Sequence, residues 1–154
     1  MEISIIPYEP IHSKAFHNLN VEWLEKYFYV EEKDKELLND CENTILKKNG
    51  HIFLAKYEEK IVGCFSFIPI NDTHFELGKM AVSEKYQGLK IGQALLKFAI
   101  RFGEQSDWDK IILYSSTKLP HALYLYKKYN FVEVPIEKDL PYARSDIKME
   151  LQLK

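Results

Sequence analysis

The sequence predicts a mixed α+β domain, and three observations support this fold class. Between Ile91 and Phe102, apolar residues recur at helical spacing and form one continuous apolar stripe. Near the C-terminus, Ile147, Met149 and Leu151 alternate with charged residues, as in a strand with one face in water. Short β-branched and aromatic segments surround these patterns. Together they give the element order β-α-α-β-β-β-α-β-α-β-β, with a β-α-β unit at its centre.

Length and composition fit one domain that covers residues 1–154. The chain has 154 residues, of which 46% are hydrophobic, and this is near the usual domain size. A chain of this length buries about 68–70% of its unfolded surface, so it needs no disulfide or metal to fold. Cys41 and Cys64 form no C-x-x-C motif, and the five histidines form no paired metal motif. We therefore expect no metal site.

Charge and hydropathy exclude several classes of partner. The formal net charge is −2, so no overall basic field favours nucleic acid. No segment approaches the ~18–20 apolar residues of a membrane span, and the N-terminus lacks the pattern of a signal peptide. We expect a cytoplasmic protein that binds neither nucleic acid nor membrane.

The first half of the chain reads as a strand, two helices and three strands. The segment 11–46 contains no Gly or Pro, and we expect two helices there with a break around residues 29–33. Glu58 and Glu59 form a tight turn between two strands, and Gly78 marks a bulge or a close backbone approach in the third. The expected strands are 3–6, 51–57, 60–68 and 75–82.

The second half continues with helix, strand, helix and two strands. After the helix that begins near Ile91, residues 110–114 form a strand. The next helix has Ser116 or Thr117 as its cap and Pro120 in its first turn. Asn130 ends this helix, because Asn adopts the left-handed closing conformation readily. The last strands are 131–134 and 144–153.

The segment from Met80 to Leu96 is a strand, a short loop and a helix, with Gly88 and Gly92 in the loop and first turn. A helix N-terminus presents unpaired N–H groups and favours negative charge. Small residues let a phosphate approach these groups. The residues from Gln87 to Gln93 are thus a candidate pyrophosphate site; the alternative is an ordinary strand-to-helix turn.

This loop resembles the acyl-CoA-binding motif of the GNAT acetyltransferases, (Arg/Gln)-x-x-Gly-x-(Gly/Ala). Gln87 matches its first position and Gly92 its last, while Lys90 stands where the inner Gly is usual. The preceding segment 76–82 is similar to the bulged strand of that family. These matches imply a CoA-binding loop.

A second motif lies downstream. Residues 122–131 resemble the family's A-x-x-L-Y-x-K-x-G-F signature, with Asn130 in place of Gly. Leu119 stands where an Asn is often found, seven residues before the signature tyrosine Tyr126. The resemblance spans about residues 60–154, over half of the chain.

The resemblance implies a GNAT-like fold: a central, twisted, mostly antiparallel sheet whose middle strands splay apart, flanked by helices. It implies an acetyl-CoA-dependent N-acetyltransferase that acts on a primary amine of a small molecule or peptide. GNAT-like proteins often dimerise, so a homodimer is one expectation. The implied cofactor-binding residues are Met80, Ala81, Val82, Gln87, Gly88, Leu89, Lys90, Ile91, Gly92 and Gln93.

Two residues are candidates for catalysis. By its place in the signature, Tyr126 is implied to donate a proton to the leaving thiolate; the alternative is a packing tyrosine. Glu76 lies on the strand before the loop, where similar enzymes can carry a general base. Its alternative is an exposed or merely positioning carboxylate. His74 shares this strand face and is a second base candidate.

The acceptor region is expected in the N-terminal helices. Eight acids and three lysines lie between Glu22 and Glu42; these acids either attract an amine or form a solvated helix face. Four aromatic residues either line an apolar acceptor pocket or belong to the core. The acids are Glu22, Glu25, Glu31, Glu32, Asp34, Glu36, Asp40 and Glu42, and the aromatics are Trp23, Tyr27, Phe28 and Tyr29.

Three other functions compete with acetyl transfer. A CoA-binding regulatory module without transferase activity is compatible with the departures at Lys90 and Leu119. A nucleotide-binding domain would need a G-x-G-x-x-G or a P-loop motif, and neither is present. A serine hydrolase would need G-x-S-x-G, which is also absent.

Overall fold

The computed structural model describes residues 2–154, which form a seven-stranded sheet flanked by helices. The sheet order is β1-β2-β3-β4-β5-β7-β6, and only β4 and β5 are parallel neighbours. This confirms the predicted fold class. The strands are β1 Ser4–Pro7, β2 His51–Tyr57, β3 Lys60–Pro69, β4 His74–Val82, β5 Lys110–Ser115, β6 Val132–Val134 and β7 Ile147–Gln152. The helices are α1 Ser13–Tyr27, α2 Glu32–Asn39, α3 Cys41–Thr44, α4 Ile91–Gln105 and α5 Pro120–Lys128, with short 3-10 turns at Pro10–His12, Leu46–Lys48 and Glu84–Tyr86.

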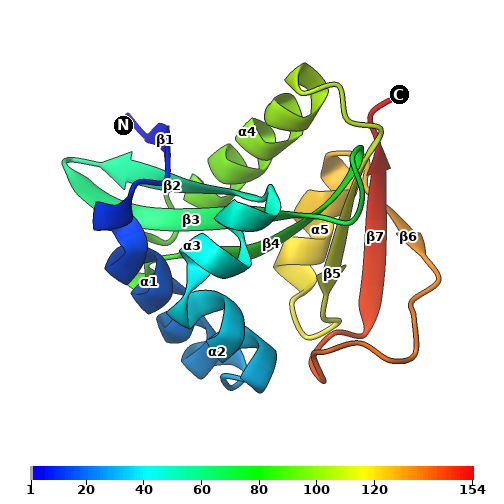
Figure 1. The fold of residues 1–154 in the computed structure, drawn as a ribbon, viewed down its shortest axis with the longest axis horizontal. Coiled ribbons are helices and arrows are strands. Elements are labelled where there is room, and N and C mark those ends of the chain that lie inside the picture. Colours follow the sequence, from blue (N-terminus) through cyan, green and yellow to red (C-terminus); the bar gives the residue numbers. More distant parts are fainter. Residues whose placement is uncertain (1) are drawn as a thin grey trace.

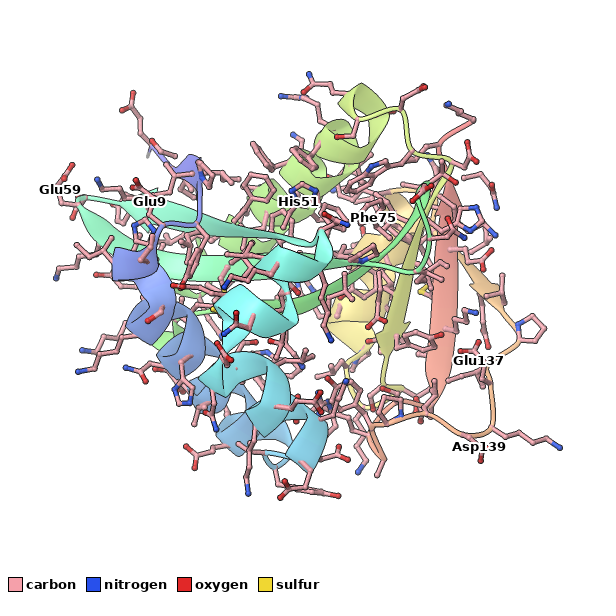
Figure 2. The ribbon with its side chains drawn as sticks, viewed as in Figure 1. Glu9, His51, Glu59, Phe75, Glu137 and Asp139 are labelled. Atoms are coloured by element: carbon pink, nitrogen blue, oxygen red, sulfur yellow. The ribbon has the colours of Figure 1, made fainter. Side chains whose placement is uncertain are left out.

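Helices cover both faces of the sheet (Figure 1). On one face, α1, α2 and α3 pack on an apolar core that includes Phe16, Leu37 and Leu54. On the other face, the predicted stripe of α4 packs on aromatic residues of β2, β3 and β4. Phe75 of β4 belongs to this second core, with His51 beside it at 6.1 Å between ring centroids (Figure 2). None of the helices within residues 2–154 has the length and apolar character to traverse a bilayer.

The two middle strands separate halfway along their length. β4 pairs with β5 only from His74 to Leu77, although β4 continues to Val82. Directly after Gly78, a bulge shifts the register of β4 against β3, and Lys79 takes a left-handed φ of 53°. The predicted bulge therefore exists, with Lys79 as its left-handed residue. Because of it, the backbone from Gly78 to Val82 turns away from β5, as the predicted splay requires.

The turn between β2 and β3 also follows the prediction. Glu58 and Glu59 have φ values of 48° and 66°, and two left-handed residues are what a two-residue type I′ hairpin needs. Glu59 lies at the outer tip of this hairpin, far from the splay (Figure 2). The hairpin joins β2 to β3 and lies outside the cavity lining.

The N-terminal helical region has one break more than expected. The break before α2 is confirmed, but the second predicted helix divides at Asp40, whose φ and ψ are −147° and 58°. The Thr44 hydroxyl donates to the carbonyls of Leu37 and Asp40 at 3.1 and 2.7 Å. The Asp40 carboxylate accepts from Asn43 at 2.9 Å. Such side-chain bonds compete with the helical ladder, so α3 starts as a separate turn.

The start of α5 differs from the prediction. Its N-cap is Leu119, and no side chain caps the helix. The Ser116 hydroxyl instead accepts the Lys118 N–H at 3.1 Å, while the Thr117 N–H donates to Asp146 at 2.8 Å. The predicted caps are therefore wrong, because other partners take both residues. The predicted end is confirmed: Asn130 is left-handed, with a φ of 74°.

The last strand is shorter than predicted. β7 begins at Ile147 rather than at residue 144. Asp146 binds the Thr117 N–H and hydroxyl, and Arg144 turns toward α2. These side-chain bonds hold the segment before Ile147 out of the sheet.

Candidate active site

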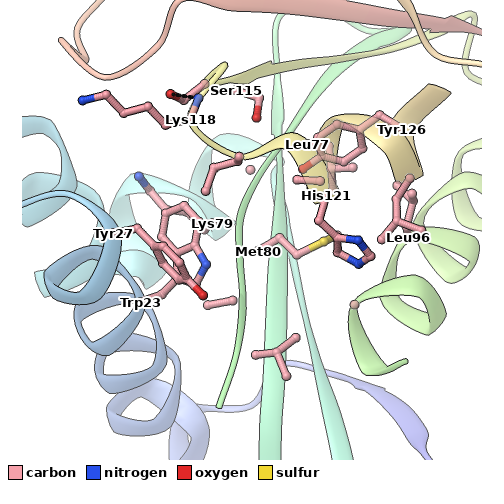
Figure 3. A pocket seen from close by; sticks show the side chains of 18 of the residues that line it. Trp23, Tyr27, Leu77, Lys79, Met80, Leu96, Ser115, Lys118, His121 and Tyr126 are labelled. Atoms are coloured by element: carbon pink, nitrogen blue, oxygen red, sulfur yellow. Dashed lines mark hydrogen bonds between the residues drawn. The ribbon is translucent and has the colours of Figure 1, made fainter. Parts of the chain in front are cut away.

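A cavity of about 780 Å³ lies where β4 and β5 separate. It runs along the backbone of β4 from Leu77 to Val82. Trp23, Tyr27 and Lys79 lie on the α1 side of β4, and Leu96 and Tyr126 lie on the side of α4 and α5 (Figure 3). The cavity thus passes from one face of the sheet to the other through the splay.

The predicted cofactor-binding residues meet at one end of this cavity. All of them line it except Leu89, which is 36% exposed and lies outside the lining. Lys90 is the N-cap of α4, and no side chain caps this helix. The first helical bond there runs from the Ala94 N–H to the Lys90 carbonyl. The N–H groups of the first turn therefore have no side-chain acceptor.

The loop before α4 has room for a ligand close to its backbone. Gly88 has a φ of 85°, and a methyl group placed on it would meet no atom within 4 Å. A methyl group on Gly92 would meet only Val82, at 3.9 Å. Lys90 itself is left-handed, with a φ of 61°. This conformation favours glycine, which explains why glycine is usual at this position of the motif.

The residues of this end fit a ligand that carries phosphates. Uncapped N–H groups at a helix N-terminus attract anions. Lys90, the N-cap of α4, adds positive charge to the cavity wall there. The structure thus combines an anion-attracting helix start at α4 with a cavity wall that follows the backbone of β4. Within residues 2–154, no three His, Cys, Asp or Glu side chains cluster as metal ligands would.

Tyr126 lines the cavity from α5. Its ring lies 5.9 Å from that of Phe131, which is buried. Burial raises the pKa of the Tyr126 phenol to about 12, so the hydroxyl keeps its proton at neutral pH. Tyr124 also lines the cavity but is 62% exposed, whereas Tyr129 does not line it. The register of α5 therefore brings Tyr126 to the splay.

Glu76 lies next to residues that line the cavity but does not line it itself. Its neighbours Phe75 and Leu77 belong to the α4 core, so Glu76 faces the opposite side of the sheet. Gly78, in contrast, lines the cavity. A methyl group on Gly78 would lie 3.8 Å from Oε2 of Glu76. Burial raises the pKa of Glu76, against the opposing charge of Lys79.

A buried charge cluster completes the other end of the cavity. Arg144 donates from Nη1 and Nη2 to Oδ2 and Oδ1 of Asp34, each at 2.8 Å. Nζ of Lys79 donates to Asp34 at 2.8 Å and to the Tyr142 hydroxyl at 2.9 Å. Burial alone would raise the pKa of Asp34, but the hydrogen bonds and charges of Arg144 and Lys79 lower it to about 2. The Asp34 carboxylate is therefore ionised and fully paired.

Sequence reasoning missed this cluster. Lys79 and Arg144 follow Asp34 by 45 and 110 residues along the chain. No local pattern joins residues so far apart. The one available signal in the sequence was Arg144, which lies just before the strand in which apolar and charged residues alternate regularly.

The N-terminal helices contribute aromatic residues to the cavity rather than free acids. Trp23, Tyr27 and Phe28 line it, whereas Tyr29 does not and is 60% exposed. Of the eight acids between Glu22 and Glu42, only Asp34 lines it. The structure therefore favours a solvated helix face for the exposed acids over an acidic acceptor wall, while Glu31 is partly buried and pairs with Arg144.

Comparison with known proteins decides the family. The sequence profile of the Acetyltransferase (GNAT) family matches residues 17–131. The chain belongs to this family. The predicted resemblance is thereby confirmed, since three quarters of the chain lie within the match. The two GNAT motifs described from the sequence lie within the matched residues.

Relatives of this GNAT protein are distant in sequence. N-acetyltransferase 8B of Homo sapiens is 25% identical over 109 residues, which are 67% of this chain and 48% of that protein. The chain thus spans about half the length of the curated relatives that it matches.

Solved structures share the fold. A GNAT acetyltransferase from Staphylococcus aureus Mu50 has a TM-score of 0.85 at 24% identity, covering 99% of this chain and 100% of that one. Spermidine N-acetyltransferase from Vibrio cholerae, solved with CoA and spermine, has a TM-score of 0.77 at 20% identity, covering 98% and 95%. At these identities the likeness establishes the fold alone.

Proposed function

We propose that this GNAT protein transfers the acetyl group of acetyl-CoA directly to a primary amine of a small molecule or peptide. One observation carries the proposal: a single cavity joins the uncapped start of α4, the Tyr126 phenol and the aromatic wall of α1. Acetyl-CoA, the Tyr126 proton donor and the acceptor amine would thus share one cavity. The acetyl group would then pass directly to the amine, without a covalent enzyme intermediate.

The residues from Gln87 to Gln93 hold the phosphates in this proposal, through the N–H groups at the start of α4. The backbone from Met80 to Val82 binds the pantetheine arm as an added strand would bind, because the splay leaves this edge of β4 unpaired by β5. Acetyl-CoA supplies the activated thioester. The chain supplies orientation and proton transfer.

Tyr126 holds a proton at the cavity wall. Its raised pKa keeps the phenol neutral at physiological pH, so its hydroxyl can donate to sulfur as negative charge develops there. A positioned donor of this kind typically contributes ~10²–10⁴-fold in rate. The fixed ring beside Phe131 limits the entropy lost when the hydroxyl is aligned.

Glu76 is the proposed general base. An acceptor amine must lose its ammonium proton before it attacks. Glu76 lies behind Gly78, whose missing side chain leaves room for a water molecule between the carboxylate and the cavity. A carboxylate with a raised pKa is a stronger base than an exposed glutamate. Proton transfer through one water would then link the amine to Oε2.

The test is release of free CoA thiol from acetyl-CoA in the presence of an amine panel. We expect thiol release that depends on the amine and yields the acetylated amine by mass spectrometry. Tight CoA binding without transfer to any amine would instead identify a CoA-binding regulatory module. The same reaction mixtures without the protein provide the matched background.

A further inference from the structure

The acceptor end of the cavity carries cations rather than free acids. Its charged residues are Asp34, Lys79 and Arg144, and its aromatic wall is Trp23, Tyr27 and Phe28. Lys79, Trp23 and Tyr27 lie together on the α1 side of β4 (Figure 3). The chemistry of this end therefore depends on which of the three charges can still bind a ligand.

Asp34 has no capacity left for a substrate ammonium. Its Oδ1 accepts from Lys79 and from Nη2 of Arg144, each at 2.8 Å. Its Oδ2 accepts from Nη1 of Arg144 at 2.8 Å and from the Glu31 N–H at 2.9 Å. A carboxylate offers about four lone-pair sites, and these four donors fill them.

No other carboxylate replaces Asp34. Glu31 lies outside the cavity lining and already accepts from Arg144 at 3.2 Å and from the Ala143 N–H at 2.9 Å. Glu76 is separated from the cavity by Gly78. Across residues 2–154, the cavity lining therefore contains no free carboxylate. A second ammonium group on an acceptor would therefore lose hydration there without gaining an unpaired counter-charge.

The two cations keep donors for an anion. An arginine has five N–H groups and a lysine has three. Arg144 makes three side-chain bonds, all from Nη1 and Nη2, and Lys79 makes two. In the described chain, no buried side-chain nitrogen lacks a partner, so Nε of Arg144 is open to the cavity or to solvent. Guanidinium groups suit carboxylates because their N–H groups match the two oxygens.

From this arrangement we infer that the acceptor is an amino acid, with a carboxylate bound by Arg144 and Lys79. This inference rests on the proposed function and narrows it. The tilted rings of Trp23 and Tyr27, 5.3 Å apart between centroids, favour an apolar or aromatic side chain on that amino acid. The lack of an unpaired carboxylate thus selects against polyamines, and the aromatic wall selects against small polar amines.

The first test compares matched acceptors. Phenylalanine, leucine and methionine are each compared with the amine that lacks only the carboxylate, and spermidine is included. We expect kcat/KM to be at least about tenfold higher for one or more of the amino acids than for its matched amine, the difference of a charge-assisted hydrogen bond. Equal or faster acetylation of the matched amines, or of spermidine, would overturn the inference while leaving acetyl transfer established.

The second test needs no catalysis. Calorimetry measures binding of 3-phenylpropanoate, which has the carboxylate but no amine, to the protein saturated with CoA. We expect binding that Arg144→Gln weakens at least tenfold and that Arg144→Lys restores in part. Arg101→Gln, an exposed arginine on α4, is the matched control and should bind as the wild type does.

The two tests separate the two proposals. Binding of 3-phenylpropanoate that depends on Arg144, without transfer to any amine, would support the carboxylate site and contradict the proposed activity. Absence of 3-phenylpropanoate binding in folded protein would contradict the carboxylate site. Because Arg144→Gln leaves Asp34 underpaired, its fold is checked by circular dichroism, and the wild-type comparison of acceptors stands without it.

Discussion

Arg144 binds both carboxylate oxygens of Asp34 at 2.8 Å and so joins the segment before β7 to helix α2. Lys79 of the β4 bulge binds the same carboxylate. Three parts of the chain therefore meet at one buried group. This contact closes the acceptor end of the cavity, and it also ties the stability of the fold to the geometry of the site.

Loss of the Asp34 charge should destabilise the protein strongly. Asp34→Asn leaves Lys79 and Arg144 partly buried without their counter-charge, and breaking a buried pair typically costs about 3–5 kcal/mol. Urea unfolding followed by circular dichroism measures the change. Asp139→Asn, in the exposed loop after β6 (Figure 2), should change the free energy of unfolding by less than about 0.5 kcal/mol. Equal effects of the two variants would contradict the buried role of Asp34.

The pairing of Asp34 with Arg144 and Lys79 should also make the free energy of unfolding depend on pH in the acidic range. The pKa of Asp34 is about 2 in the folded protein, below its ordinary value of 3.8. A lowered pKa stabilises the fold above the unfolded value and loses this effect as pH falls toward the folded one. The difference between these two pKa values corresponds to about 2 kcal/mol in the free energy of unfolding. We expect the gap in unfolding free energy between wild type and Asp34→Asn to shrink between pH 4 and pH 2, where an unchanged gap would argue against this linkage.

Removal of the Tyr126 hydroxyl should slow transfer without affecting cofactor binding. Tyr126→Phe should lower kcat by ~10²–10⁴-fold, because the leaving thiolate loses its proton donor. The affinity for CoA, measured by calorimetry, should stay the same. Tyr129→Phe on the same helix lies outside the cavity and should retain full activity. A fully active Tyr126→Phe enzyme would assign the proton to water or to a backbone group.

Substitution of Glu76 should give a defect that depends on pH. Glu76→Gln should lower kcat/KM most near neutral pH and least at high pH, where the amine is already deprotonated. In the wild type, the raised pKa of Glu76 moves the acidic limb of the pH profile above that of an exposed glutamate. Full pH profiles of both proteins test this. A constant defect at every pH would indicate positioning rather than proton transfer.

A bulky, negatively charged side chain in the proposed phosphate site should weaken CoA binding strongly. Gly92→Glu places a carboxylate among the N–H groups at the start of α4, where the open space beside Val82 accommodates it. We expect the affinity for CoA to fall by at least about 100-fold, since the anion would meet both bulk and like charge. Gln105→Glu adds the same charge at the exposed far end of α4 and should bind CoA normally. Tight binding by folded Gly92→Glu protein would move the phosphate site elsewhere.

Local sequence patterns were enough for most of the strands and for helix α4, and they predicted the proposed cofactor-binding residues that line one end of the cavity. The apolar stripe of α4 and the Glu58–Glu59 turn depend on interactions between residues near in sequence, so their periods and turn residues appear directly in the chain. Tyr126 was found for the same reason, because its position relative to Asn130 and Phe131 fixes the face of α5 on which it lies.

Only the tertiary structure decided the interactions of side chains whose partners lie far away in the sequence. Asp146 binds Thr117, 29 residues before it, and so takes one of the two caps expected for α5. The pairing of Asp34 with Lys79 and Arg144 neutralises the one acid at the acceptor end. A carboxylate and a cation attract each other whatever their separation along the chain, so sequence spacing carries no record of such pairs. The sequence predicted where the proposed cofactor end of the site lies, and folding determined which charges line the opposite end of the cavity.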